Sequence, residues 1–201
     1  MKVAPDVAYC MNLDSRTDRL AQIKLDFKKF QNKTGIELER VSSILDEKNP
    51  QRGTAQTVAK IIKRAAELKL EYVLIVEDDL EILDVNKVHE SLMDAPNEWD
   101  ILSGGVYYYC PDGEYNENWM KISDFCSLHF VIIHNRCYDV ILELCERAAH
   151  LDRIIGTYIK HKKLEAFVMN PMPCRQRAGY SNIRKRFVDD NTRKNLPWVS
   201  E

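Results

Sequence analysis

Three consecutive carboxylates, Glu77, Asp78 and Asp79, are the residues of this sequence whose types and spacing most clearly suggest chemistry. They directly follow an apolar run over residues 72–76, which is typical of a strand buried on both faces. Open α/β sheets place their ligands at the carboxyl ends of strands. Adjacent carboxylates repel one another unless they are solvated or bind a hard cation such as Mg²⁺ or Mn²⁺. The stretch therefore predicts either a metal site or a solvated acidic turn.

Two arginines form a second candidate group. Arg16 and Arg19 lie in the polar stretch that follows a short apolar run over residues 7–11. Three positions apart at the start of a helix, they would lie close together, and the guanidinium fork suits phosphate. The alternative is that both are surface arginines paired with Asp14 or Asp18.

Charge is distributed unevenly along the chain. From Glu71 to Asp100 there are ten acids and one lysine, whereas from Lys160 to Phe187 there are eight Lys or Arg and one acid. These regions could supply a cation site and an anion site in one cleft, or two unrelated solvated faces. The net charge of -2 over 201 residues gives no indication of a nucleic-acid partner.

Length and composition indicate a single α/β domain. We expect a domain over residues 1–188 and a polar tail or linker over residues 189–201. Six scattered cysteines without a Cys-x-x-Cys pair indicate reduced thiols and a cytoplasmic protein. The sequence has no apolar signal core and no run long enough to span a bilayer, so we expect neither secretion nor membrane insertion.

Hydrophobic periodicity predicts alternating strands and helices. Strands are expected at residues 7–11, 37–43, 72–76, 99–103, 106–109, 127–133 and 164–169. Helices are expected after residue 16 as far as Gly35 and at residues 54–70, 86–93, 138–149 and 151–161. Asp14 or Ser15 would cap the first helix, and Thr54 would cap the second.

Two further stretches suggest contact with a ligand. Gly104 and Gly105 follow a strand, where they allow a ligand to approach the backbone closely or simply allow a tight bend. Residues 111–124 are polar and are expected to form a loop or flap over one end of the sheet. Aromatic residues in and before this loop could stack on a sugar or base, or could be ordinary core and surface residues: Tyr107, Tyr108, Tyr115 and Trp119.

The sequence contains no P-loop, nucleophile elbow, Gly-x-Gly-x-x-Gly or zinc-binding spacing. The chemistry must therefore come from carboxylates, arginines and a cation. A divalent cation on the acids with arginines nearby is what a nucleoside-diphosphate leaving group requires, because charge develops on the diphosphate as the glycosidic bond breaks. These residues predict a nucleotide-sugar reaction.

The sequence also resembles the GT-A glycosyltransferases of family 25, the lipopolysaccharide and collagen galactosyltransferase group. Residues 9–19 are similar to the family's Asn-Leu-x-x-Arg-x-Asp-Arg signature, and Glu77-Asp78-Asp79 to its Asp-x-Asp-type motif. Trp99-Asp100 with Gly104-Gly105, Leu151-Asp152, and the closing block Gln176, Ser181, Asn182 and Ile183 resemble later blocks of the family, although Asn182 replaces the usual acid.

The resemblance implies a fold and a reaction. The fold is a Rossmann-like GT-A domain with a mixed, mostly parallel central sheet flanked by helices. The reaction moves a sugar from a UDP-sugar donor to a hydroxyl of a glycan or glycoprotein acceptor. Mn²⁺ or Mg²⁺ is implied as the cofactor.

The resemblance also implies roles for individual residues. Glu77, Asp78 and Asp79 would hold the metal. The donor nucleotide would contact residues of the first loop, the acidic motif and the tail: Asn12, Leu13, Arg16, Arg19, Asp78, Gln176, Arg177 and Ser181. Asp152 would be the general base of an inverting reaction, or would only position a sugar in a retaining one. Its alternative role is that of an acid stabilised by a helix macrodipole.

Two other classes remain open. The strand with its acids also resembles the start of a phosphorelay receiver, in which Asp124 would have to be the phosphorylated residue. A non-catalytic glycan-binding or protein-binding module of the same fold is the third possibility. Metal-dependent hydrolysis of a nucleotide sugar distinguishes a transferase from a binding module, and phosphorylation by a small phosphodonor identifies a receiver.

Overall fold

The computed structural model describes residues 1–147, 150–181 and 186–189. The prediction for the tail over residues 189–201 lies outside the described residues except at Asp189. The helices are α1 (Thr17–Thr34), α2 (Pro50–Glu67), α3 (Val85–Met93), α4 (Tyr138–Arg147) and α5 (Leu151–Lys160), with a 3₁₀ turn, η1, at Asn135–Cys137. The strands of the main sheet are β1 (Val7–Asn12), β2 (Glu37–Ser42), β3 (Tyr72–Glu77), β5 (Ile101–Ser103), β6 (Tyr108–Asn116), β7 (Trp119–Cys126), β8 (Phe130–His134) and β9 (Ala166–Met169).

These eight strands lie in the order β2-β1-β3-β8-β5-β9-β7-β6. The pairs β2-β1, β1-β3 and β5-β9 are parallel, and the other four pairs are antiparallel. The prediction of a helix-flanked α/β domain is confirmed, but the prediction of a mostly parallel sheet is wrong. An apolar run reports that a strand is covered on both faces, and β8 is buried in this way while running antiparallel to both of its neighbours.

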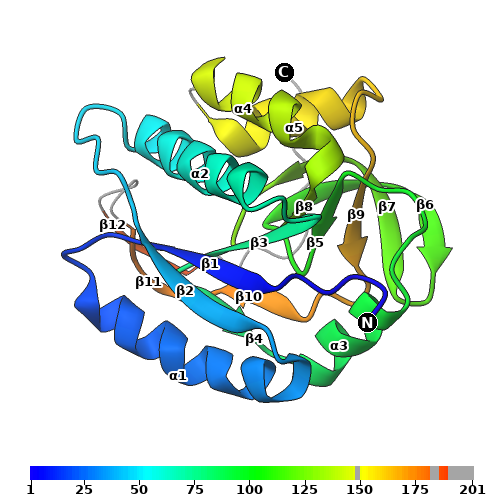
Figure 1. Cartoon of the computed structure of the whole chain (residues 1–201), viewed down its shortest axis with the longest axis horizontal. Coiled ribbons are helices and arrows are strands. Elements are labelled where there is room, and N and C mark those ends of the chain that lie inside the picture. Colours follow the sequence, from blue (N-terminus) through cyan, green and yellow to red (C-terminus); the bar gives the residue numbers. More distant parts are fainter. Residues whose placement is uncertain (148–149, 182–185, 190–201) are drawn as a thin grey trace.

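Helices cover both faces of the sheet. Helices α1 and α3 lie on one face, and α2, α4 and α5 lie on the other (Figure 1). The α1 face buries Ile23, Phe27 and Phe30, whose spacing places them on one side of the helix. The opposite core contains the apolar stripe of α2, including Ile61 and Ile62. Both layers leave the carboxyl ends of β1 and β3 free to carry a site.

The capping predictions were wrong for both N-terminal helices. Arg16 occupies the N-cap of α1 without a side-chain cap, because the Asp14 carboxylate instead accepts hydrogen bonds from Arg40 and Ser42. Helix α2 begins at Pro50, four residues earlier than predicted, and the Asn49 side chain caps it by accepting a hydrogen bond from the Arg52 backbone N–H.

The predicted flap is a hairpin. Strands β6 and β7 pair antiparallel, and β7 also pairs with β9, so residues 108–126 extend the sheet instead of covering it. The polar residues of this stretch reflect an edge strand whose side chains face solvent. Trp119 anchors the hairpin: its side chain is fully buried, and its indole N–H donates to the Ser91 carbonyl.

Short strands bring the C-terminal stretch back to the acids. Strand β4 (Leu80–Ile82) follows the carboxylates directly and pairs antiparallel with β10 (Cys174–Gln176). Strands β11 (Gly179–Ser181) and β12 (Arg186–Val188) form a separate pair. Residues 174–176 thus lie beside the stretch that follows β3. This pairing could not be predicted from the sequence, because the paired residues are about ninety positions apart.

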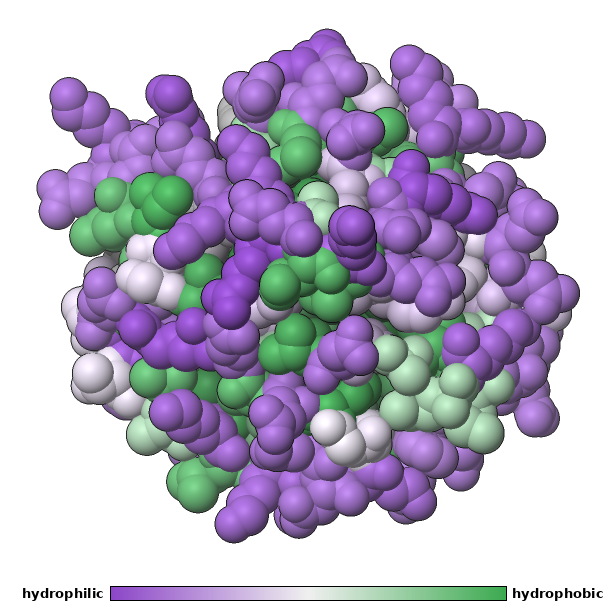
Figure 2. All heavy atoms as spheres, in the orientation of Figure 1, coloured by the Kyte–Doolittle hydropathy of each residue, from purple (hydrophilic) through white to green (hydrophobic). Residues whose placement is uncertain are grey.

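The surface seen in Figure 2 is largely hydrophilic, and apolar side chains appear between charged ones in separate patches. All six cysteines lie in the described part of the chain, and none of them forms a disulfide there. Among the described residues, no helix has both the length and the apolar composition that crossing a membrane requires.

The two adjacent glycines allow close packing against the chain itself. A Cβ on Gly105 would lie 2.1 Å from the Cys174 carbonyl oxygen, and one on Gly104 would lie 2.7 Å from the Phe130 ring. The space beside them is therefore occupied by β10 and β8, and the interpretation of these glycines as a ligand contact is wrong.

We expect Gly105→Ala to lower the free energy of unfolding by about 1–3 kcal/mol, because the new methyl group must displace the backbone of β10. Urea denaturation measures the change. Gly179→Ala is the matched control, since its Cβ would meet only the end of the Arg19 side chain at 3.6 Å. Equal stabilities of the two variants would contradict the close approach of β10.

Candidate functional site

The acidic cluster lies where the carboxyl ends of β1 and β3 meet. Asn12, at the end of β1, is 1% exposed, and its side-chain amide donates to Asp78 Oδ2 at 2.7 Å. The same amide group donates to the Arg16 carbonyl and accepts from Arg40 Nε. Asn12 therefore fixes the first loop to the acidic cluster from behind, whereas the sequence had suggested that it contacts a nucleotide.

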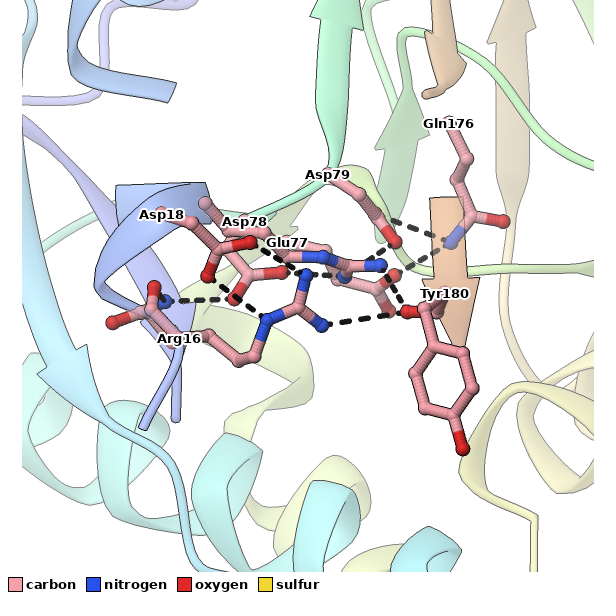
Figure 3. Close-up of polar contacts among 9 residues, drawn as sticks. Arg16, Asp18, Glu77, Asp78, Asp79, Gln176 and Tyr180 are labelled. Carbon is pink, nitrogen blue, oxygen red and sulfur yellow. Dashed lines mark hydrogen bonds and ion pairs between the residues drawn. The ribbon is translucent and has the colours of Figure 1, made fainter. Parts of the chain in front are cut away.

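Arg19 is the internal counter-ion of the cluster. Its Nη1 atom lies 2.9 Å from both Asp78 Oδ1 and Asp79 Oδ2. Its Nη2 atom donates to the Tyr180 carbonyl at 2.8 Å. Arg16, by contrast, pairs with Asp18 and also reaches the Tyr180 carbonyl at 3.3 Å (Figure 3). Both guanidinium groups reach the Tyr180 carbonyl, so the predicted proximity of the two arginines is confirmed. The alternative of two surface arginines paired with Asp14 or Asp18 holds only for Arg16, because Arg19 binds the acidic cluster.

The tail contacts the same acids from the opposite side. The Gln176 amide donates to Glu77 Oε2 at 2.8 Å and to Asp79 Oδ1 at 3.4 Å (Figure 3). The Arg177 backbone N–H donates to the Asp79 carbonyl at 2.7 Å. The Arg177 guanidinium pairs with Asp26 of α1 and lies 3.9 Å from Glu81. Arg177 thus joins the tail to α1 and β4, and its charge is already balanced by these acids.

Burial and mutual repulsion raise the pKa of two acids of the cluster. Burial first, and then the charges of Asp79, Asp78 and Asp152, raise the pKa of Glu77 well above its usual value. Burial also raises the pKa of Asp79, although the Arg19 guanidinium opposes that shift. The single arginine does not neutralise three carboxylates, so the site retains an affinity for further positive charge.

Two cavities adjoin the cluster and share part of their walls. The first has a volume of about 620 Å³ and includes Leu13, Arg16, Asp78 and Tyr180. The second has a volume of about 460 Å³ and includes Tyr107, Ser127, Asp152 and Arg177. Residues common to both are Arg19, Thr54, Glu77, Asp79, Gln176 and Ser181. The acids therefore stand at the boundary between two binding spaces, one on the arginine side and one on the Asp152 side.

Asp152, in the first turn of α5, is held by three donors. Its Oδ2 atom accepts from the Cys126 thiol at 2.9 Å and from the Ser127 backbone N–H at 3.0 Å, and Oδ1 accepts from the Arg153 backbone N–H at 2.9 Å. The carboxylate faces the second cavity and is close enough to Glu77 to raise its pKa.

Other predicted residues lie away from the site. Trp99 packs on Tyr72, and the Asp100 carboxylate binds Arg136 and the Glu165 backbone N–H, so this pair has a structural role. Asp124, the residue that a receiver would phosphorylate, is bound by Arg153 and lines neither cavity. Asn182 and Ile183 lie outside the described residues.

Sequence reasoning missed Ser127 and His129. Ser127 lines the second cavity, and its hydroxyl lies 2.6 Å from Nδ1 of the buried His129. No motif marks either residue, and only the folded chain brings them beside Asp152.

The chemistry of the cluster fits a hard cation, although its present arrangement does not yet form a ligand set. Carboxylate oxygens with excess negative charge are the donors that Mg²⁺ and Mn²⁺ prefer. In the described part of the chain, however, no three of His, Cys, Asp and Glu converge on one metal position. Arg19 stands between Asp78 and Asp79, so these two acids can turn toward a cation only if the guanidinium moves away.

Comparison with known proteins relates the fold to glycosyltransferases. No family model and no curated protein matches the sequence. A glycosyltransferase involved in glycosylation of the PBCV-1 major capsid matches with a TM-score of 0.56 and 12% identity, over 81% of this chain and 79% of that one. A mutant of Drosophila beta-1,4-galactosyltransferase 7, in complex with manganese, UDP-Gal and xylobiose, matches with a TM-score of 0.54 and 12% identity, over 96% and 76% of the two chains.

A third similar structure is A197 from STIV, with a TM-score of 0.52 and 15% identity, covering 97% of both chains. At these identities the likeness concerns the fold alone. The chain has the mixed α/β fold of GT-A glycosyltransferases, as the sequence resemblance implied.

We expect Glu77→Gln to raise the free energy of unfolding of the metal-free protein at pH 7 by on the order of 1 kcal/mol. Folding raises the pKa of Glu77, so the protonated form favours the folded state, and that stabilisation is lost as the pH rises through the folded pKa. A neutral amide mimics the protonated acid. The gain should therefore shrink as the pH falls toward the pKa of an unfolded glutamate.

Urea denaturation with chelator present, repeated between pH 4.5 and 8, measures the difference from the unaltered protein. Glu117→Gln is the matched control because its side chain is exposed and remote from the cluster. A loss of stability at pH 7 in Glu77→Gln, or a gain that does not depend on pH, would contradict the assigned repulsion.

Proposed function

We propose that this protein is a metal-dependent glycosyltransferase that moves a sugar from a UDP-sugar to a hydroxyl of a glycan or glycoprotein acceptor. The observation that carries the proposal is the placement of Glu77 and Asp79 in the shared wall of two adjoining cavities. A transferase needs a donor space and an acceptor space that meet at the reacting centre. The GT-A fold supports the proposal. The similarity to the motifs of family 25 supports the narrower proposal that the protein belongs to that family.

The donor would occupy the cavity that contains Leu13 and Arg16. There Arg16 and Arg19 would stabilise the negative charge that develops on the departing UDP. Gln176 and Ser181, on the shared wall, would contact the diphosphate or the transferred sugar. We assign Arg177 a smaller part than the sequence suggested, because its guanidinium is balanced by Asp26.

Glu77, Asp78 and Asp79 would hold Mn²⁺ or Mg²⁺ when donor binds. The bound ion would neutralise charge on the diphosphate and orient it. Arg19 already occupies the space between two of these acids, so metal entry and movement of Arg19 would be coupled. The released guanidinium would then be available to the phosphates.

Asp152 would act from the acceptor side. Its carboxylate lies in the second cavity with the shared acids, where an acceptor hydroxyl must lose its proton if the reaction inverts configuration. Hydrogen bonds from Cys126 and Ser127 hold the carboxylate in place.

The biological setting follows from weaker observations. The PBCV-1 neighbour acts in capsid glycosylation, which suggests a glycoprotein acceptor for this chain also. Six cysteines without a disulfide among the described residues support the expectation of a cytoplasmic protein, in the host cytoplasm if the chain is viral. We propose no nucleic-acid partner and no membrane insertion.

A non-catalytic module of the same fold is the second candidate, because no metal ligand set is formed among the described residues. Release of UDP from UDP-sugars separates the two, since a binding module retains the donor intact. A phosphorelay receiver is disfavoured, because Asp124 is held by Arg153 away from the acidic cluster.

We expect Asp79→Ala to weaken Mn²⁺-dependent binding of UDP by about 100-fold or more, because the variant loses a metal ligand that also forms part of the wall between the cavities. Calorimetric titration with Mn²⁺ and with chelator measures the affinity, and thermal unfolding checks that the fold is intact. Asp112→Ala is the control, since its side chain is exposed on β6. Unchanged metal-dependent affinity in Asp79→Ala would remove the metal assignment.

We expect Asp152→Asn to bind UDP with unchanged affinity but to transfer sugar at least about 100-fold more slowly, as loss of a general base predicts. The amide oxygen can still accept from Cys126 and Ser127, so the local structure is retained. Initial rates of UDP release with acceptor present measure the effect. Full activity of this variant would rule out the role of base.

A further inference from the structure

Ser127 has a backbone conformation that side chains rarely adopt. Its φ angle is 104°, whereas Lys69 and Lys162, the other described non-glycine residues with positive φ, both have φ of 55° in the ordinary left-handed region. A glycine would adopt this conformation without strain. Strained residues persist where their surroundings hold them firmly, and they cluster at functional sites. What serine adds here over glycine is its hydroxyl.

Two contacts fix this residue in the second cavity. The Ser127 backbone N–H donates to Asp152 Oδ2 at 3.0 Å, so the proposed base also stabilises the strained turn. The Ser127 hydroxyl lies 2.6 Å from Nδ1 of His129. The neighbouring residues on this wall, Leu128 and Leu151, are buried and apolar. Ser127 is therefore held in the wall that it shares with Asp152, by its backbone on one side and by its hydroxyl on the other.

The surroundings of His129 determine which way the hydroxyl proton points. The ring is 2% exposed and is enclosed by the chain itself. Its Nε2 atom faces the backbone of Cys174, outside ordinary hydrogen-bond geometry. A nearby carbonyl favours the proton on Nε2, which leaves Nδ1 to accept from Ser127. The serine oxygen then keeps lone pairs that the contact with His129 does not use.

We propose that Ser127 Oγ binds a hydroxyl group of the acceptor and holds that acceptor beside Asp152, with His129 as the positioning residue that orients the serine. The inference rests on the proposed function, to which it adds the binding site of a polyol acceptor. An alcohol donates a hydrogen bond to Ser127 Oγ, whereas a substrate without a free hydroxyl has no donor for this contact. The Tyr107 side chain lies in the same cavity, where an aromatic ring can pack on a sugar face.

The test compares transfer with hydrolysis of the donor. The protein is incubated with Mn²⁺ and either UDP-glucose or UDP-galactose as donor. Xylobiose and a panel of methyl glycosides serve as acceptor probes. The glycoside product and the free sugar are both quantified. We expect Ser127→Ala and Ser127→Gly to lower the ratio of glycoside to free sugar at least tenfold, while the affinity for UDP stays unchanged.

The glycine variant separates binding from folding. Ser127→Gly removes the hydroxyl and relieves the backbone strain, so it should unfold at the same temperature as the unaltered protein or a higher one. Ser123→Ala is the matched control, because its hydroxyl bonds the Cys110 carbonyl and lines neither cavity. It should leave both the ratio and the acceptor KM unchanged.

Each outcome decides between the claims. The unaltered protein could hydrolyse the donor and yet give a ratio of glycoside to free sugar no higher than that of the Ser127 variants. This result would overturn the assignment of Ser127 to the acceptor and would leave the proposed function standing. Absence of UDP binding and UDP release from the unaltered protein overturns the proposed function, and this inference with it.

Discussion

The repulsion among three adjacent carboxylates at the end of β3 is the constraint on which the rest of the site depends. Two unit charges about 4 Å apart repel by about 4 kcal/mol at an effective dielectric of about 20. Arg19 offsets part of this cost through Asp78 and Asp79, and Gln176 donates to Glu77. The acids therefore recruit α1 from one side and the C-terminal tail from the other.

This arrangement explains why distant parts of the chain meet. The Tyr180 carbonyl accepts from both Arg16 and Arg19, and β10 pairs with the strand that follows the acids. The tail thus forms part of the site and also separates the two cavities through Gln176 and Ser181. A donor that replaces the internal contacts of Arg19 would at the same time reorganise the tail, so donor binding and formation of the acceptor space are coupled in this proposal.

Much of the fold could be predicted from the sequence, because apolar periodicity reports burial directly. The α1 stripe, the buried run before Glu77 and the αL cap at Gly35 follow from local physics. Strand direction could not be predicted, because β8 carries the same apolar signal in an antiparallel setting. The β6–β7 hairpin was mistaken for a loop because the solvent-facing residues of an edge strand look like those of a loop.

For the site, too, some features could be predicted from the sequence and others could not. Charge and spacing marked Asp79 and Arg19 as neighbours of a phosphate or cation site, and the structure brings them together. Asn12 and Arg177 have internal partners that only the fold supplies, and no sequence pattern indicated these contacts. Ser127 carries no local signal at all, because its importance lies in a backbone angle and in a contact with His129.

The most direct measurement is a crystal structure with UDP and Mn²⁺. A larger cavity, of about 1110 Å³, lies along α2 and includes Arg52, Lys60 and Lys63 in its lining, so it is the alternative place for the diphosphate. Our account predicts that uracil and ribose occupy the cavity with Leu13, and that the diphosphate and metal lie against Glu77-Asp78-Asp79 with Arg19 displaced. UDP bound in the groove along α2, or metal bound away from the acids, would contradict it.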